Sequence, residues 1–183
     1  MRKARPRIYA GEAILAGPLS VEPAHEVLEP RDMAEGKVDM QHDTYEPDYL
    51  RKILTDVRTI ALLGASPNPD RPSHGVMRFL LSKGYRVFPV NPGQAGKEIL
   101  GQKVYARLAD IPEPVDMVDV FRAPEYLSAI VEEAILLPQR PSVIWGQLSV
   151  RDDNSAAKAE AYGMNVVMDR CPAIEYPRLN IVR

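Results

Sequence analysis

The chain has 183 residues, of which 45% are hydrophobic and 26% are charged, and its formal net charge is -2 at pH 7. This length suits one domain with one core and is short for two. A near-neutral balance argues against a protein built around a basic nucleic-acid-binding face. No apolar run reaches the roughly 20 residues needed to cross a bilayer, and the chain has 1 cysteine, so we expect a cytoplasmic protein without disulfides.

Residues 1–44 differ from the rest of the chain. They carry prolines and charges without a helical or strand-like period, which is typical of a poorly ordered N-terminal extension. Translation from Met40 is the alternative to a genuine extension. His25 and His42 lie here without a cysteine or carboxylate cluster, so we expect solvated side chains rather than metal ligands. The predicted domain covers residues 45–183.

Strand-like and helix-like segments alternate from residue 45 onward. Compact apolar runs predict buried strands over 59–63, 85–90, 115–121, 142–145 and 165–168. Apolar residues three and four apart predict helices over 47–54, 75–83, 124–137 and 152–162, and a short helix is expected at 106–110. Such alternation predicts a Rossmann-like, doubly wound parallel α/β sheet of about five strands with helices on both faces.

The loop after the first predicted strand carries the clearest chemical signal. Gly64 allows a sharp turn at the strand end, and the Ser66 hydroxyl can bond a phosphate oxygen. The helix that follows directs free backbone N–H groups at the same place, and Arg71 adds a positive charge. These features predict a site for an anionic nucleotide. The alternative is a tight turn with a solvent-facing arginine.

The motifs of the commonest nucleotide sites are missing. Gly64 is followed by Ala65-Ser66-Pro67, so a G-x-G-x-x-G fingerprint is incomplete, and the second strand ends at Asn91 without a carboxylate. Both features weaken an NAD interpretation, and no ATP P-loop is present. The strand-end loops also lack carboxylate pairs, serine–histidine–acid sets and metal-ligand spacings. No catalytic or metal-binding residue is therefore predicted.

Four motifs follow one another along the chain: Gly64-Ala65-Ser66-Pro67-Asn68-Pro69, then GYRVFPVNP at 84–92, VDVFR at 118–122 and VMDRC at 167–171. Together they resemble the small stand-alone CoA-binding proteins, which look like the CoA-binding domain at the start of the succinyl-CoA synthetase alpha subunit. The likeness runs from about residue 40 to 179. It implies a Rossmann-like fold and coenzyme A, or an acyl-CoA, as the ligand.

The resemblance also implies three groups of contacts. Those around the pyrophosphate and its charge are Gly64, Ala65, Ser66 and Arg71. Those on the adenosine side are Val90, Asn91 and Pro92, and those along the pantetheine are Phe121 and Arg122. One departure concerns the fourth strand, where the family usually shows Trp-Leu-Gln and this chain reads Trp145-Gly146-Gln147. No role is carried over to Trp145 or Gln147.

Several side chains near these loops have two interpretations. Arg122 could contact the ligand or pair with Glu125. Cys171 could form a mixed disulfide with the CoA thiol, or be a small buried apolar residue. Trp145 is expected in the core with a partner for its indole N–H. His74 is expected on the surface at a helix entry.

Two classes of function follow. The favoured one is non-catalytic binding of CoA or an acyl-CoA, with no nucleic acid, membrane or identified protein partner. The alternative is an enzyme, either an NAD(P)-linked oxidoreductase or a CoA-binding subunit of an acyl-CoA ligase. A ligase role would require a partner chain, because the sequence has no room for a further catalytic domain.

Overall fold

A central parallel sheet organises residues 41–182, which the computed structural model describes. Its strands lie in the order β2-β1-β5-β6-β7. Their bounds are Thr59–Leu63 for β1, Arg86–Val90 for β2, Met117–Val120 for β5, Val143–Gly146 for β6 and Asn165–Val167 for β7. All neighbouring pairs are parallel, which confirms the predicted doubly wound sheet.

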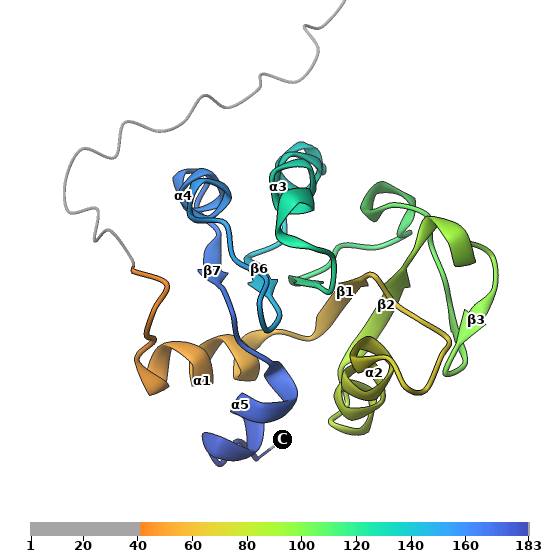
Figure 1. The fold of residues 1–183 in the computed structure, drawn as a ribbon, viewed down its shortest axis with the longest axis horizontal. Helices are drawn as coiled ribbons and strands as arrows, with labels where there is room; N and C mark the ends of the chain where they lie inside the picture. The colour runs from red at the N-terminus through yellow and green to blue at the C-terminus, as the bar shows by residue number, and fades with distance from the viewer. Residues whose placement is uncertain (1–40, 183) are drawn as a thin grey trace, which may run out of the picture.

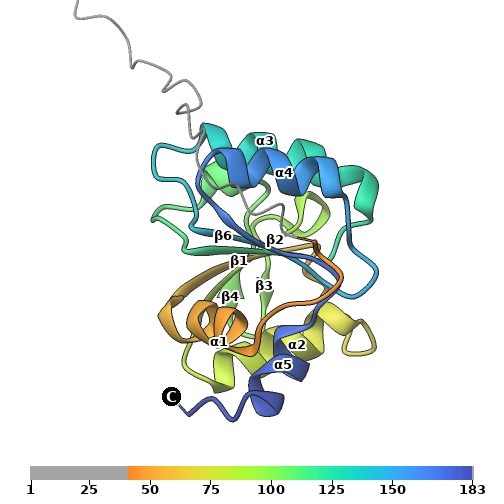
Figure 2. The same ribbon diagram turned by 90° about the vertical axis from the view of Figure 1, so that its left-hand side faces the viewer.

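Helices cover both faces of this sheet (Figure 1, Figure 2). On one face lie α1 (Pro47–Asp56), α2 (Pro72–Ser82) and α5 (Pro172–Arg178). On the other lie α3 (Leu127–Leu136) and α4 (Asp153–Ala161). All residues of β1, β5 and β6 are buried because both faces are covered, and this explains why these strands read as continuous apolar runs. The core accordingly forms two clusters, one on each face.

The strand order places a topological switch point beside β1. From β1 the chain moves outward to β2, and it then crosses back to place β5 on the other side of β1. The chain therefore leaves β1 and β5 toward opposite faces of the sheet. In open α/β sheets, ligands bind at the carboxyl ends of strands at such a switch point.

Smaller elements occupy 91–114, where the sequence indicates little regular structure. They are the 3-10 helices η1 (Pro92–Gln94) and η2 (Leu108–Asp110), and a hairpin of β3 (Glu98–Ile99) and β4 (Gln102–Lys103). A third 3-10 helix, η3 (Pro124–Tyr126), precedes α3. Pro89 fits within β2 because β2 is the edge strand of the sheet.

Two helices differ from the prediction. α2 begins at Pro72, three residues before the predicted start, because proline takes a first-turn position in which it loses no hydrogen bond. α5 was not predicted: it has 7 residues and contains Pro177, so it shows little helical periodicity. Gly84 and Gly163 adopt positive φ angles of 80° and 82°, which agrees with their predicted places after helices.

Two histidines expected at the surface are buried. His42 is 5% exposed, and its Nδ1 lies 2.9 Å from the Tyr45 hydroxyl, so it is not a solvated side chain. His74 is 6% exposed, because position 74 of α2 faces the sheet. Residues 1–40 of the predicted N-terminal extension, His25 included, lie outside the described residues. Within 41–182, no helix has the length and hydropathy needed to cross a membrane.

Candidate nucleotide site at the carboxyl edge of the sheet

Backbone hydrogen bonds bring the ends of three strands together. The Gly64 N–H donates to the Val90 carbonyl at 2.9 Å, which joins the ends of β1 and β2. The Phe121 N–H donates to the Leu63 carbonyl at 2.8 Å, which joins the ends of β1 and β5. The three predicted regions around Gly64, Val90 and Phe121 therefore form one continuous edge.

Gly64 is the point of closest approach in this edge. Its φ angle is +86°, in the region that side chains other than glycine rarely adopt. A Cβ at this position would lie 3.0 Å from the Phe121 carbonyl oxygen. The close approach of the loops after β1 and β5 therefore favours glycine at position 64, since a Cβ there would displace Phe121.

The loop between β1 and α2 is held open by its own polar groups. The Asn68 N–H donates to Ser66 Oγ at 3.2 Å, and the Asp70 N–H donates to Asn68 Oδ1 at 2.9 Å. Since Ser66 Oγ accepts in this turn, its hydroxyl proton remains to be donated to an outside acceptor. Ala65, beside it, is 1% exposed and anchors the loop in the core.

The first turn of α2 follows this loop directly. Arg71 is the N-cap residue, and no side chain caps this end of the helix. Pro72 has no N–H and the His74 N–H donates to the Arg71 carbonyl at 3.0 Å, so in this first turn the Ser73 N–H and the positive end of the helix dipole remain for a negative group. Arg71 itself is exposed, and within residues 41–182 its guanidinium makes no side-chain hydrogen bond or ion pair.

Of the three residues predicted on the adenosine side, two have structural roles and one is exposed. The Asn91 side chain donates from Nδ2 to the Ala65 carbonyl at 2.7 Å and accepts at Oδ1 from the Gly93 N–H at 3.0 Å. The Asn91 side chain thus fixes the loop between β1 and α2. Val90 is 4% exposed and packs in the core, whereas Pro92 is exposed at the start of η1.

Phe121 and Arg122 follow β5 directly and lie at the switch point. Phe121 is partly buried against the core cluster on the α1, α2 and α5 face. The Arg122 guanidinium lies 4.6 Å from the centre of the Tyr126 ring. In the described part of the chain Arg122 forms no ion pair with Glu125. Its contact with the Tyr126 ring is not predicted by the sequence.

A buried carboxyl group beneath this edge was also missed. Asp119, on β5, is 0% exposed, and its Oδ1 accepts a hydrogen bond of 2.8 Å from Gln147 Nε2. Oδ2 is buried without a hydrogen-bond partner. Burial raises the pKa of Asp119 to about 7, because removal from water disfavours the carboxylate. A charged residue type within the apolar run Met117–Val120 is the sequence signal that could have identified it.

The loops after β6 and β7 close the far side of the site. Trp145 is 0% exposed, and its indole N–H donates to the Arg170 carbonyl at 2.7 Å, as expected of a core tryptophan. A Cβ at Gly146 would lie 2.5 Å from the Val150 carbonyl oxygen. The leucine usual in the resembling family would collide there, which explains the departure at this position.

Cys171 lies between β7 and α5 and is 7% exposed. Burial raises the pKa of its thiol, with smaller effects in the same direction from Asp119 and Glu175. Because the thiolate is the reactive form, we expect Cys171 in the native protein to react with Ellman's reagent at least about tenfold more slowly than in the denatured chain. Equal rates in both states would contradict a buried, unreactive thiol.

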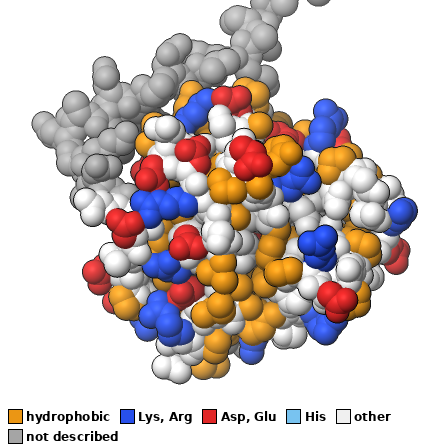
Figure 3. All heavy atoms as spheres, in the orientation of Figure 1, with side chains coloured by type: hydrophobic (Ala, Val, Ile, Leu, Met, Phe, Trp, Pro, Cys, Tyr) orange, Lys and Arg blue, Asp and Glu red, His pale blue; other side chains and the backbone are white. Residues whose placement is uncertain are grey.

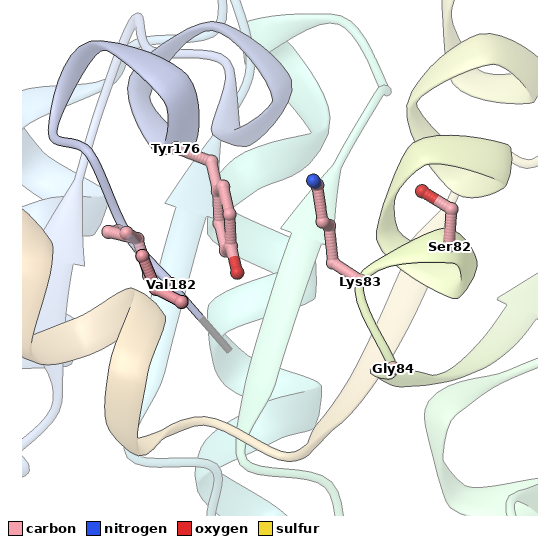
Figure 4. A pocket seen from close by; sticks show the side chains of 6 residues that line it. Ser82, Lys83, Gly84, Tyr176 and Val182 are labelled. Carbon is pink, nitrogen blue, oxygen red and sulfur yellow. The ribbon is translucent and has the colours of Figure 1, made fainter.

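A cavity lies at the opposite edge of the sheet. It has a volume of about 560 Å³ and lies between the end of α2 and α5 (Figure 4). The Lys83 ammonium lies 5.2 Å from the centre of the Tyr176 ring, which also lines the cavity. Since Gly84 precedes β2, this cavity is remote from the carboxyl edge.

Charges of both signs share the molecular surface. Figure 3 shows Lys and Arg side chains interspersed with Asp and Glu on the face that it presents. Several of these charges form exposed pairs, such as Lys158 with Glu132 at 2.8 Å. Among the described residues, no group of three or more His, Cys, Asp or Glu side chains is arranged to hold a metal ion.

Comparison with known families agrees with this arrangement. Residues 58–177, from just before β1 to within α5, match the family described as CoA binding domain. The chain belongs to the CoA binding domain family. The matched range includes the switch point and all the loops at the carboxyl edge.

Relatives of this CoA binding domain protein include both short and long chains. It is 35% identical over 122 residues to the uncharacterized protein YneT of Bacillus subtilis, across 67% of this chain and 87% of YneT. It is 37% identical to a hypothetical protein from Pyrococcus horikoshii of known structure, with a TM-score of 0.70. The match covers 81% of this chain and 100% of that chain.

A longer relative is an enzyme subunit. The alpha subunit of the ADP-forming acetate–CoA ligase I of Pyrococcus furiosus is 31% identical over 84 residues, which are 44% of this chain and 18% of the subunit. The shared part of the subunit is therefore small.

Proposed function

We propose that this protein binds coenzyme A or an acyl-CoA at the carboxyl edge of its sheet, without catalysing a reaction itself. The observation that carries the proposal is the meeting of an uncapped helix N-terminus, an unpaired Arg71 and the glycine turn at the switch point of a CoA binding domain. Phosphate groups are the ligands that such a combination favours.

Each part of the ligand has a matching part of the edge. The Ser66 hydroxyl and the Ser73 N–H in the first turn of α2 donate to the pyrophosphate, while Arg71 neutralises its charge. Arg122, whose guanidinium lies 4.6 Å from the centre of the Tyr126 ring, offers a positive charge beside the switch point. The pantetheine then passes Phe121 toward the apolar region between β1, β5 and β6.

The second part of the proposal is that the site does not accept NAD or NADP. A dinucleotide site needs an acidic side chain after the second strand to hold the ribose hydroxyls. Here Asn91 occupies that place, and both ends of its amide are engaged by Ala65 and Gly93. We therefore expect NAD and NADP to bind weakly or not at all.

Calorimetric titration with CoA, acetyl-CoA, NAD and NADP tests the proposal. We expect saturable binding of the CoA compounds, and a tenfold to hundredfold loss of affinity (roughly 1.5–3 kcal/mol) in Arg71→Ala, because a charge-assisted contact is removed. Arg58→Ala is the matched control, since Arg58 is exposed at the opposite end of β1. Binding of NAD without detectable binding of CoA would refute the proposal.

A further inference from the structure

The cavity between α2 and α5 contains a positive charge without a negative partner. Lys83, the C-cap residue of α2, lines this cavity of about 560 Å³ (Figure 4). Its ammonium lies 5.5 Å from the centre of the Phe79 ring and 5.2 Å from that of the Tyr176 ring. Within residues 41–182 the ammonium forms no ion pair. Two aromatic rings therefore hold the charge at the cavity and leave its N–H donors available.

The Tyr176 hydroxyl adds a second donor to the same cavity. Tyr176 is 3% exposed, and its ring packs edge-on against Phe79 and Tyr85. In the described part of the chain the hydroxyl forms no hydrogen bond, and in Figure 4 it points into the space between Val182 and Lys83. Because a tyrosine as buried as this one usually pairs its hydroxyl, the unused donor indicates a ligand with an acceptor.

The other lining residues determine the sign of the charge that the cavity accepts. None of them is acidic, and the Ser82 hydroxyl already donates to the Phe79 carbonyl at 2.7 Å. The C-terminal end of α2 carries only about half of a negative elementary charge, which the full charge of Lys83 outweighs. A single negative group beside Lys83 is therefore favoured.

The cavity also has an apolar wall and a suitable size. Ile181 and Val182 line it, and Val182 is 94% exposed, so its side chain is open to contact with a ligand. Sites for small organic molecules typically have volumes of roughly 300–1,000 Å³, a range that includes this cavity. One ammonium and one hydroxyl match the two oxygens of a carboxylate, whereas a phosphate group carries more charge than one lysine neutralises.

We propose that this cavity is a second ligand site, which binds a small organic acid through its carboxylate. Lys83 pairs with the carboxylate, the Tyr176 hydroxyl donates to it, and a short apolar chain of the ligand covers Val182. The inference goes beyond the proposed function and does not depend on it, because none of these residues belongs to the carboxyl edge of the sheet.

Titration of the isotope-labelled full-length protein with butyrate, followed by nuclear magnetic resonance, tests the inference. We expect saturable shifts of the backbone amide signals of residues 82–84 and 181–182. Butyramide has a similar shape without the charge, and it should bind about tenfold more weakly because it loses the charge-assisted contact. From acetate to hexanoate, affinity should rise by about twofold per methylene, since each methylene removes some apolar surface from water.

Three variants assign the contacts. Lys83→Gln should lower the affinity for butyrate about tenfold and remove its advantage over butyramide. Tyr176→Phe keeps the ring and should lower the affinity about fivefold, since one hydrogen bond is lost. Lys103→Gln is the matched control and should bind butyrate as the wild type does: the Lys103 ammonium also lies 5.5 Å from a tyrosine ring, that of Tyr105, but Lys103 does not line the cavity.

Several results would overturn the inference. One is the absence of saturable shifts with acetate, butyrate and hexanoate alike, and another is equal affinity for butyrate and butyramide. Equal losses in Lys83→Gln and Lys103→Gln would also overturn it, because they would indicate general attraction of anions to a charged surface. Thermal unfolding checks that each variant is folded. Failure of the wild type to bind CoA would refute the proposed function alone and leave the result at this cavity unaffected.

Discussion

Replacing Gly64 with alanine is expected to lower the free energy of unfolding by about 2–4 kcal/mol and to abolish ligand binding. Two costs combine. An alanine at a φ angle of +86° is strained by about 1–2 kcal/mol. Its Cβ would also lie 3.0 Å from the Phe121 carbonyl oxygen and 3.2 Å from the Phe121 Cβ, so the loop after β5 must move.

Gly84→Ala provides the matched control for this prediction. Gly84 has a similar φ angle of +80°, but nothing lies within 4 Å of a Cβ built there. Its substitution should cost only the backbone term of about 1–2 kcal/mol and leave ligand binding unchanged. Urea denaturation measures both variants. Equal destabilisation of the two would show that the approach of the loops after β1 and β5 is not tight.

The second large effect concerns the pH dependence of stability. The pKa of Asp119 is about 7 in the folded protein, against about 3.9 for an exposed aspartate. The folded state therefore binds more protons than the unfolded state between these values, and stability falls as the pH rises through this window. We expect this group to remove about 4 kcal/mol in total between about pH 4 and pH 7, with no further loss above it.

Asp119→Asn should abolish this part of the pH dependence. Asparagine resembles the neutral acid and can accept from Gln147, so the variant should match the wild type at about pH 4.5 and exceed it at about pH 8. Asp110→Asn is a control of opposite sign, since Asp110 is exposed and Arg107 lowers its pKa. A constant stability difference between wild type and Asp119→Asn across these pH values would contradict the prediction.

The sequence predicts the sheet well because burial on both faces leaves a plain signal. Thr59–Leu63 is entirely apolar apart from its first residue, and it is an interior strand of the sheet. The loop between β1 and α2 is also easy to locate, since Gly64, Ser66 and Arg71 are close together in sequence, and its role as a phosphate site stays a prediction. The match to the CoA binding domain family confirms the resemblance on which the ligand was inferred.

Contacts between distant residues are what the sequence does not predict. Asp119 and Gln147 are 28 residues apart, and nothing local indicates that they meet. Asn91 is predicted beside the ligand, and the sequence does not indicate that its amide also holds the loop between β1 and α2 through Ala65. His42 was assigned to the extension, yet it is 5% exposed and its Nε2 lies 3.6 Å from the Glu160 carboxylate, far along the chain, so tertiary contacts rather than local composition decide its burial.

The position of β1 between β2 and β5 has a consequence for synthesis of the chain. β1 obtains its first neighbour from β2 soon after α2, but its second neighbour is β5, and Arg58 must meet Asp116 from 58 residues away. Until β5 is made, one edge of an apolar strand remains unpaired. The interval between the emergence of β2 and that of β5 from the ribosome is therefore when this chain is most exposed to aggregation.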